Sequence, residues 1–368
     1  MPRYGKWETI DKIDSGGQGV VYSARDSELL DLEQTKWSIA DASLGIVPTS
    51  FREAQLAKAA ALAEGILKYG RANTTEYCGA LKVLHSVSNS AEISKQLERM
   101  KHEIKGLRAL SHPNIVRILD ENLDEQWFVM ELFFEGTLST KLSMNRGDFT
   151  SALRRFRPLV EAVASMHEAG LVHRDIKPDN IFCSSGRLVL GDLGLVHFVD
   201  EKRTRISDAY ENVGSRDWMP PWAMGMRLED IRPSFDVFSL GKLLWAMASG
   251  KPVLQLWYLH HERFELEKMF PNNLEMRWAR KILDHCIVEK EEDCLTNAKE
   301  LLRLVDTVLS ALERHSQIVG DGIPRICRVC GLGHYTEMNP QIVALQSFRM
   351  FKCSSCGHTE LFFHPKTT

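Results

Sequence analysis

Eight consecutive residues, His173 to Asn180, hold the side chains of this sequence that are best suited to chemistry. Asp175 and Asn180 both carry side-chain oxygen atoms, and Asp192 follows twelve residues after Asn180 within Asp-Leu-Gly. Carboxylate and amide oxygens are ligands that Mg²⁺ accepts beside substrate phosphates. Phosphoryl transfer also requires a carboxylate near the attacking hydroxyl group. These residues would suit phosphoryl transfer, with Asp175 near the hydroxyl and with Asn180 and Asp192 as metal ligands.

The sequence between about Trp7 and Leu312 resembles the eukaryotic-type (Hanks-type) serine/threonine protein kinase family. The resemblance rests on the loop just described, on Ala80-Leu81-Lys82, and on the run Asp-Val-Phe-Ser-Leu-Gly that begins at Asp236. These motifs in this order are far more specific than a lone glycine-rich turn. The resemblance implies transfer of the γ-phosphate of ATP to Ser or Thr hydroxyls of protein substrates, and autophosphorylation.

The resemblance also implies roles for single residues. Lys82 would hold the α- and β-phosphates of ATP, and Glu103 would be its ion-pair partner. Asp175 would orient the substrate hydroxyl and accept its proton, and Lys177 would meet the transferred phosphate. The implied cofactors are ATP and Mg²⁺, or Mn²⁺ in its place.

An adenine pocket is implied by the same resemblance. The backbone at Glu131 and Phe133 would bond the base, with Met130 beside this hinge. Asp14 stands where the family usually has its first loop glycine, so we expect weaker or altered nucleotide affinity. The residues expected around the nucleotide are Ile13, Gly16, Gly17, Gly19, Val21, Ala80, Lys82, Met130, Glu131, Phe133 and Phe182.

The segment after Asp192 resembles an activation segment. Arg174 would pair with a phosphate added there, and Thr204 and Ser207 are the candidate acceptors. The alternative is that both are unmodified polar loop residues. Trp222 and Leu295 stand where the family usually has a glutamate and its arginine partner. We expect these two apolar side chains to pack together instead.

Hydrophobic periodicity predicts the elements that position these residues. We expect an α+β, bilobal protein kinase fold: a small antiparallel-sheet lobe with a long helix, then a large helical lobe. The predicted strands lie within 6–26, around a glycine turn, and at 80–84, 115–119 and 127–132. The predicted helices are 91–110, 153–169, 235–248, 274–288 and 298–312.

Three domains are predicted. Residues 1–132 form the small lobe, with a helical insertion at 27–76, and residues 133–315 form the large lobe. The insertion is either an elaborated loop whose amphipathic helix packs on the small lobe, or a surface for a partner or a second copy. Residues 316–368 form the cysteine-containing tail.

Two C-x-x-C-G motifs lie in the tail and resemble the knuckles of a zinc ribbon. Cys327 and Cys330 form one pair, Cys353 and Cys356 the other, with 22 residues between the pairs. Four thiolates can close a tetrahedral structural Zn²⁺ site. The alternatives are disulfides or incidental thiols. The ribbon would recruit a partner or substrate.

Composition limits the class of protein. The 368 residues include 46 Lys and Arg against 49 Asp and Glu, and 44% are hydrophobic. This balance excludes a disordered chain and gives no basis for a nucleic-acid stripe. Since the sequence contains no membrane-length apolar run and no signal-like start, we expect a cytoplasmic protein. The alternative to an enzyme is a pseudokinase scaffold that acts through the insertion and the ribbon.

Overall fold

The computed structural model describes most of the chain between its ends. The described residues are 2–15, 19–28, 78–84, 90–193, 197–198, 216–224, 230–254, 261–316, 327, 335–337, 348–353 and 357–363. Several predictions fall outside them: Gly16, Gly17, Thr204, Ser207, Cys330, Cys356 and nearly all of the 27–76 insertion.

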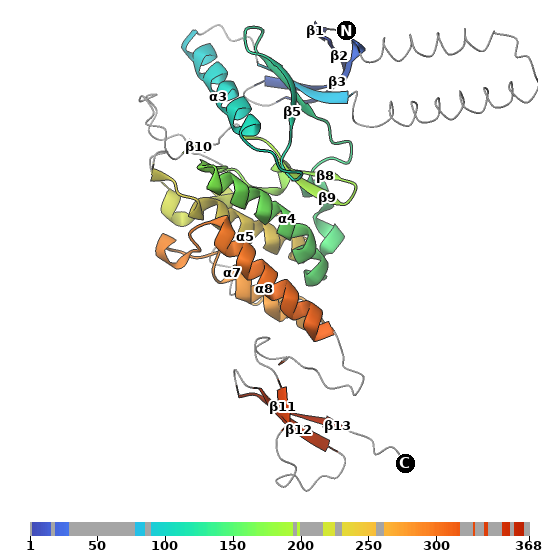
Figure 1. Cartoon of the computed structure of the whole chain (residues 1–368), viewed down its shortest axis with the longest axis vertical. Helices are drawn as coiled ribbons and strands as arrows, with labels where there is room; N and C mark the ends of the chain where they lie inside the picture. Colours follow the sequence, from blue (N-terminus) through green and yellow to red (C-terminus); the bar gives the residue numbers. More distant parts are fainter. Residues whose placement is uncertain are drawn as a thin grey trace, which may run out of the picture. The chain divides into compact units, whose positions relative to one another are not determined.

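The chain divides into two compact units. One comprises Met1–Leu138 and Asp179–Phe198, and the other comprises Ser139–Pro178 and Val199–Thr368. We call them the sheet unit and the helical unit (Figure 1). No helix in the described part of the chain is both long and apolar enough to cross a membrane.

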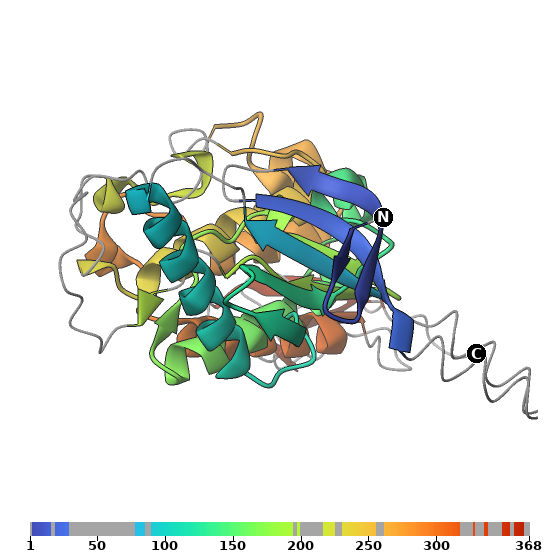
Figure 2. The same cartoon turned by 90° about the horizontal axis from the view of Figure 1, so that it is seen from above.

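The sheet unit contains a six-stranded antiparallel sheet in the order β1-β2-β3-β4-β6-β5. Its strands are β1 (Arg3–Tyr4), β2 (Trp7–Ser15), β3 (Gly19–Asp26), β4 (Cys78–Leu84), β5 (Ile118–Asn122) and β6 (Trp127–Glu131). Helix α3 (Ser90–Arg108) lies beside the sheet in Figures 1 and 2. The unit also contains the hairpin β8 (Ile181–Ser184) and β9 (Arg187–Leu190), and the short β10 (His197–Phe198).

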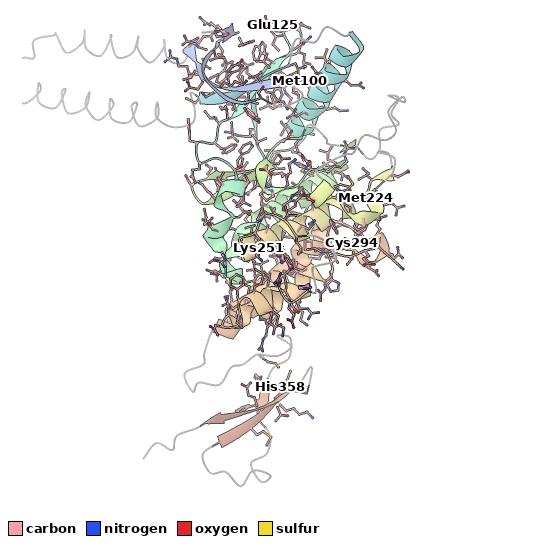
Figure 3. All side chains as sticks on the ribbon, turned by 180° about the vertical axis from the view of Figure 1, so that it is seen from behind. Met100, Glu125, Met224, Lys251, Cys294 and His358 are labelled. Atoms are coloured by element: carbon pink, nitrogen blue, oxygen red, sulfur yellow. The ribbon has the colours of Figure 1, made fainter. Side chains whose placement is uncertain are left out.

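The two faces of the sheet have separate apolar clusters. Trp7, Ala24, Leu81, Trp127 and Val129 form one cluster. The other joins Leu84 and Phe128 to Met100 and Ile104 of α3 (Figure 3). Because successive strand residues point to opposite faces, Lys82, between buried Leu81 and half-buried Val83, shares the α3 face with Leu84.

The helical unit is built around α5 (Ser234–Ser249), in which every residue is buried. Gly250, at φ 72°, ends this helix in the left-handed conformation that glycine adopts readily. The unit's other helices are α4 (Phe149–Glu168), α6 (Leu266–Met269), α7 (Ala279–Leu283) and α8 (Ala298–Ser316).

Short 3₁₀ turns and strands complete the described elements. The turns are η1 (Leu138–Asn145), η2 (Pro178–Asn180), η3 (Arg216–Trp218), η4 (Pro221–Ala223), η7 (Leu274–Trp278) and η8 (Glu291–Asp293). The two-residue strand β7 is Leu171–Val172. In the tail, β11 (Tyr335–Glu337), β12 (Phe348–Cys353) and β13 (Thr359–Phe363) form a three-stranded antiparallel sheet.

Two of the predicted elements are wrong. The predicted helix 274–288 is a 3₁₀ turn followed by the five-residue α7 and further turns. Packing decides this: a Cβ on Gly241 of α5 would lie 2.4 Å from Cys286 Cβ, so this turn sits directly on α5. The strand predicted at 115–119 begins only at Ile118, because Val116 donates its amide to Leu190 of β9 instead.

Candidate active site

Lys82 of β4 and Glu103 of α3 form a buried ion pair. The Lys82 Nζ to Glu103 Oε2 distance is 2.7 Å, and the two side chains are 13% and 3% exposed. Burial alone would lower the pKa of Lys82, but the negative charges of Glu103 and Asp192 raise it above its ordinary value. Lys82 therefore stays positively charged, held by one carboxylate and attracted by a second.

The hairpin β8–β9 explains the spacing between Asn180 and Asp192. Ile181 pairs with Leu190 in register, and the amide of Gly191 donates to the Asn180 carbonyl at 2.9 Å. Residues twelve positions apart in sequence therefore flank the open end of one hairpin. The Asp192 side chain is exposed and its backbone is left-handed, at φ 53°. An amide and a carboxylate at this end form a suitable oxygen donor set for Mg²⁺.

The sheet register places the expected nucleotide-contacting residues on one face. Val21 lies opposite Lys82, and Ala80 lies opposite Met130. Directly opposite residues in a sheet project to the same side, and so do residues two apart along one strand. Ile13, in contrast, is 51% exposed near the end of β2.

Two expected residues near the adenine position are stacked aromatic rings. The Phe133 and Phe182 centroids are 5.0 Å apart with 14° between the ring planes. Gly191 makes this arrangement possible, because a Cβ there would lie 2.3 Å from Phe182 Cε2. At the hinge, the Arg117 guanidinium pairs with the Glu131 carboxylate at 2.6 Å.

Asp175 and Lys177 lie together in the helical unit. Lys177 Nζ is 2.8 Å from Asp175 Oδ2, and the Asp175 side chain is only 7% exposed. The amide of Asp175 donates to His173 Nδ1 at 3.2 Å. His173 is fully buried.

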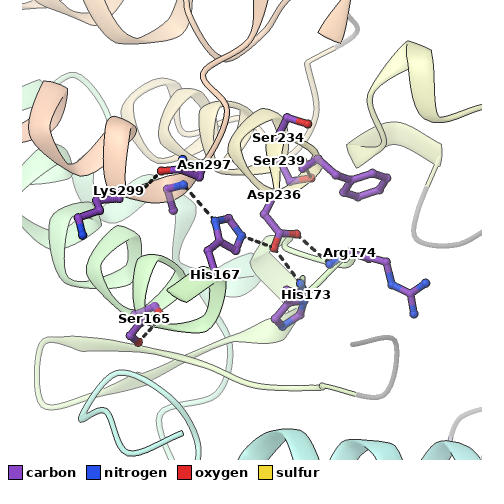
Figure 4. Close-up of polar contacts among 12 residues, drawn as sticks. Ser165, His167, His173, Arg174, Ser234, Asp236, Ser239, Asn297 and Lys299 are labelled. Atoms are coloured by element: carbon purple, nitrogen blue, oxygen red, sulfur yellow. Dashed lines mark hydrogen bonds and ion pairs between the residues drawn. The ribbon is translucent and has the colours of Figure 1, made fainter. Parts of the chain in front are cut away.

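The buried Asp236 carboxylate holds this loop (Figure 4). It accepts the backbone amides of His173 and Arg174 at 2.8 Å each, and lies 2.9 Å from His167 Nε2. Arg174 has a left-handed backbone, at φ 68°, which is uncommon for a residue with a side chain. The carboxylate thus fixes a strained turn immediately before Asp175.

His167 is a site residue that sequence reasoning missed. Its Nδ1 accepts the amide of Ala298 at 3.0 Å while Nε2 faces Asp236, so the ring links α8 to α5. A lone histidine in a helix carries little signal. Its position six residues before His173 was the available clue.

Trp222 lies in an apolar cluster of the helical unit. It packs against Val172, Met219, Ala223, Ile231 and Phe235, and its ring meets Phe238 edge-on at 5.5 Å. Its predicted contact with Leu295 stays a prediction.

Comparison with known proteins assigns the family. Residues 64–314 match the model of the protein kinase domain, well over half of the chain. The chain belongs to the protein kinase family. The resemblance to the protein kinase family is thereby confirmed. The six-stranded sheet with α3, and the helices α4 to α8, fit the bilobal kinase fold.

Curated relatives of this kinase domain are serine/threonine-protein kinases. CHK1 of Saccharomyces cerevisiae is 32% identical over 173 residues, covering 46% of this chain and 32% of the relative. The pak-2 kinase of Caenorhabditis elegans is 29% identical over 218 residues, covering 56% and 40%. The pkn2 kinase of Myxococcus xanthus is 33% identical over 181 residues, covering 47% and 21%. The chain thus spans less than half the length of each.

We predict that Gly191→Ala destabilises the kinase domain by about 1–3 kcal/mol, because the new methyl group must displace the Phe182 ring. Phe182→Leu should make room for it. The double variant should therefore lose less stability than the sum of the two single variants, as measured by chemical denaturation. Strict additivity would contradict the proposed clash.

We predict that Asp236→Asn costs about 2–4 kcal/mol at pH 7, because an amide cannot accept all the donors that face this carboxylate. Burial alone would raise the pKa of Asp236, but His167 and the His173 amide lower it below its ordinary value. The contribution of the Asp236 carboxylate to the free energy of unfolding is therefore complete above about pH 4, the pKa of this group in the unfolded chain. It is lost as the pH falls further. Chemical denaturation between pH 2 and 7 measures it.

Asp124→Asn, at an exposed turn residue, is the control for Asp236→Asn. It should change stability by less than about 0.5 kcal/mol at any pH. A cost at Asp236 no larger than that would show that the carboxylate does not hold the loop.

Proposed function

We propose that this kinase domain transfers the γ-phosphate of ATP to Ser or Thr hydroxyls of protein substrates, and also to its own chain. The observation that carries this proposal is the buried Lys82–Glu103 ion pair with the Asp192 charge acting on it. A purely structural scaffold gains little from burying two charges beside a third. A site for a triphosphate uses all three.

The donor set fits a divalent cation. The Asp192 carboxylate is exposed, and Asn180 adds an amide oxygen from the same end of the hairpin. When bound there, Mg²⁺ would supply positive charge to the phosphate oxygens during transfer. The protein's own part is positioning: Lys82 binds the phosphates, and Glu103 prevents Lys82 from moving.

Asp175 is the proposed base for the substrate hydroxyl. It orients the hydroxyl group and accepts its proton as the new P–O bond forms and the bond from the γ-phosphorus to the departing ADP breaks. Lys177 Nζ lies 2.8 Å from the Asp175 carboxylate and can shift to the transferred phosphate. Its presence supports Ser or Thr as the acceptor. Thr204 and Ser207 remain the proposed phosphorylation sites.

The nucleotide would lie along the face of the sheet that carries Lys82. Val21, Ala80 and Met130 share that face by register, and Phe133 and Phe182 provide a flat apolar surface for adenine. The backbone at Glu131 and Phe133 is the proposed hydrogen-bonding edge. Gly16, Gly17 and Gly19 would close over the phosphates.

We further propose that the tail binds a structural Zn²⁺ through Cys327, Cys330, Cys353 and Cys356. Cys327 and Cys353 are buried, and Gly357 turns the chain at φ 73° while donating its amide to the Cys353 carbonyl. A tight turn of this kind brings paired thiolates toward one cation. Among the described residues no three ligand side chains gather, and two of the four cysteines lie outside them.

The ribbon and the 27–76 insertion are the proposed surfaces for recruiting partners or substrates, and the cytoplasm is the proposed location. A pseudokinase scaffold is the competing function. It would bind nucleotide without transferring phosphate, so one assay separates the two.

We predict that purified protein with radiolabelled ATP and Mg²⁺ labels a protein substrate, and that Asp175→Asn lowers kcat by about 10²–10⁴-fold. Asp192→Asn should abolish Mg²⁺-dependent labelling. Asp124→Asn, the same change at an exposed turn, should leave activity unchanged. Nucleotide binding without labelling, in the presence of Mg²⁺ or Mn²⁺, would favour the scaffold.

We predict one zinc ion per chain by metal analysis of the full-length protein. Cys327→Ser and Cys353→Ser should each lower zinc content and affinity, because three thiolates hold the ion less tightly than four. Cys78→Ser, at a half-buried cysteine of β4, should keep the metal. Equal zinc content in all of these proteins would refute the four-cysteine site.

A further inference from the structure

A lysine lies in the middle of the fully buried helix α5. Lys242 is 4% exposed, and its Nζ donates a hydrogen bond to the backbone carbonyl of Asp217 in η3. The same ammonium group lies over two aromatic rings, 5.9 Å from the Trp218 centroid and 5.7 Å from that of Phe238. Among the described residues no carboxylate pairs with it directly.

Neighbouring residues of α5 hold the same short segment. Ser239 Oγ donates to the Trp218 carbonyl at 2.9 Å. The Phe238 and Trp222 rings meet in a T-shaped contact. Positions 238, 239 and 242 therefore share a surface of α5 that contacts the segment 217–222 at both of its ends.

An apolar residue would be the default for a position buried this deeply. Placing an ammonium group there costs free energy unless something stabilises the charge. Here a carbonyl and two ring faces provide that stabilisation, and both are strongest for the protonated amine. The rings and the carbonyl belong largely to the segment, so the charge binds the segment to the helix.

We propose that Lys242 is a positioning residue that holds the segment 217–222 on α5. This segment follows Asp192 in the stretch that resembles an activation segment, so its order would affect the binding of a peptide substrate. The link to a peptide substrate rests on the proposed kinase function. The anchoring itself rests on the contacts of Lys242 and Ser239.

The protonation state of Lys242 makes this anchor sensitive to pH. Burial lowers the pKa of Lys242 to about 8, and the negative charge of Asp217 opposes part of that shift. Asp217 on η3 is the charged group of the described residues that acts on this lysine. The amine is therefore protonated at neutral pH and largely neutral at pH 9, where the attraction to the rings weakens.

The depressed pKa also has a consequence for stability. A buried lysine whose folded pKa lies below its unfolded value carries a cost at low pH, and this cost disappears as pH rises from about 8 to about 10.4. Lys242→Met, which removes the charge but keeps most of the volume, should thus fold at least as stably at pH 7. A loosened segment in a stable variant would reveal anchoring rather than a general structural role.

Hydrogen–deuterium exchange of peptides covering 216–224 tests the anchor in the full-length protein. We expect exchange at pH 7 to be about tenfold faster in Lys242→Met than in the wild type. In the wild type, the exchange rate, corrected for its intrinsic pH dependence, should increase at pH values above 8 and approach the rate of the variant. Ser239→Ala should show a smaller increase.

Lys251→Met is the matched control, since Lys251 is an exposed lysine that also lies over a ring, 4.9 Å from the Phe264 centroid (Figure 3). Its exchange profile over 216–224 should equal that of the wild type. Equal profiles for the wild type and Lys242→Met would overturn the proposal. If Lys242→Met does not fold, the pH series of the wild type decides the question. An exchange rate over 216–224 that does not increase above pH 8 would then overturn the proposal.

Kinetics then connect the anchor to the substrate. We expect Lys242→Met to raise KM for a peptide substrate about tenfold, with KM for ATP unchanged. Between pH 7 and 9, peptide kcat/KM should fall in the wild type more than in the variant. If the wild type labels no peptide, the kinase proposal fails while the exchange experiment still judges the anchor.

Discussion

The buried carboxylate of Asp236 is the interaction on which the helical unit depends. A charge at 0% exposure must find donors, because leaving it unpaired costs several kcal/mol. The backbone amides of His173 and Arg174 are two of these donors, so the position of the carboxylate fixes the position of the loop that carries Asp175. The same helix, through Lys242, holds the segment 217–222. One buried helix thus positions the proposed base and the proposed substrate surface.

A second buried charge organises the sheet unit. Lys82 can remain charged in its mostly buried position because the charges of Glu103 and Asp192 offset the loss of water around its ammonium group. Such a pair is weak evidence for stability, because its desolvation cost is large. Its effect is geometric: it connects strand β4, helix α3 and the β8–β9 hairpin at one point. Nucleotide phosphates are the ligand that would use this concentration of charge.

Local pattern predicted most of the elements correctly. Strand-forming residues predicted β2, β3, β4 and β6, and helix-forming residues with helical spacing predicted α3, α4, α5 and α8. The pattern was wrong at 274–288, where contact with Gly241 favours turns, and at 115–119, where Val116 bonds to β9. In both places a distant partner outweighed the local periodicity.

Residue types and their spacing defined the chemistry: which residues carry carboxylate, amide and ammonium groups, and the twelve-residue spacing that one hairpin closes. These are properties of side chains and of short chain segments. The folded arrangement set the pairings of Asp236 with the loop, of Phe182 with Gly191, and of Lys242 with Asp217. Each of them depends on packing between elements far apart in the chain or on a close approach of atoms, neither of which residue type or periodicity encodes.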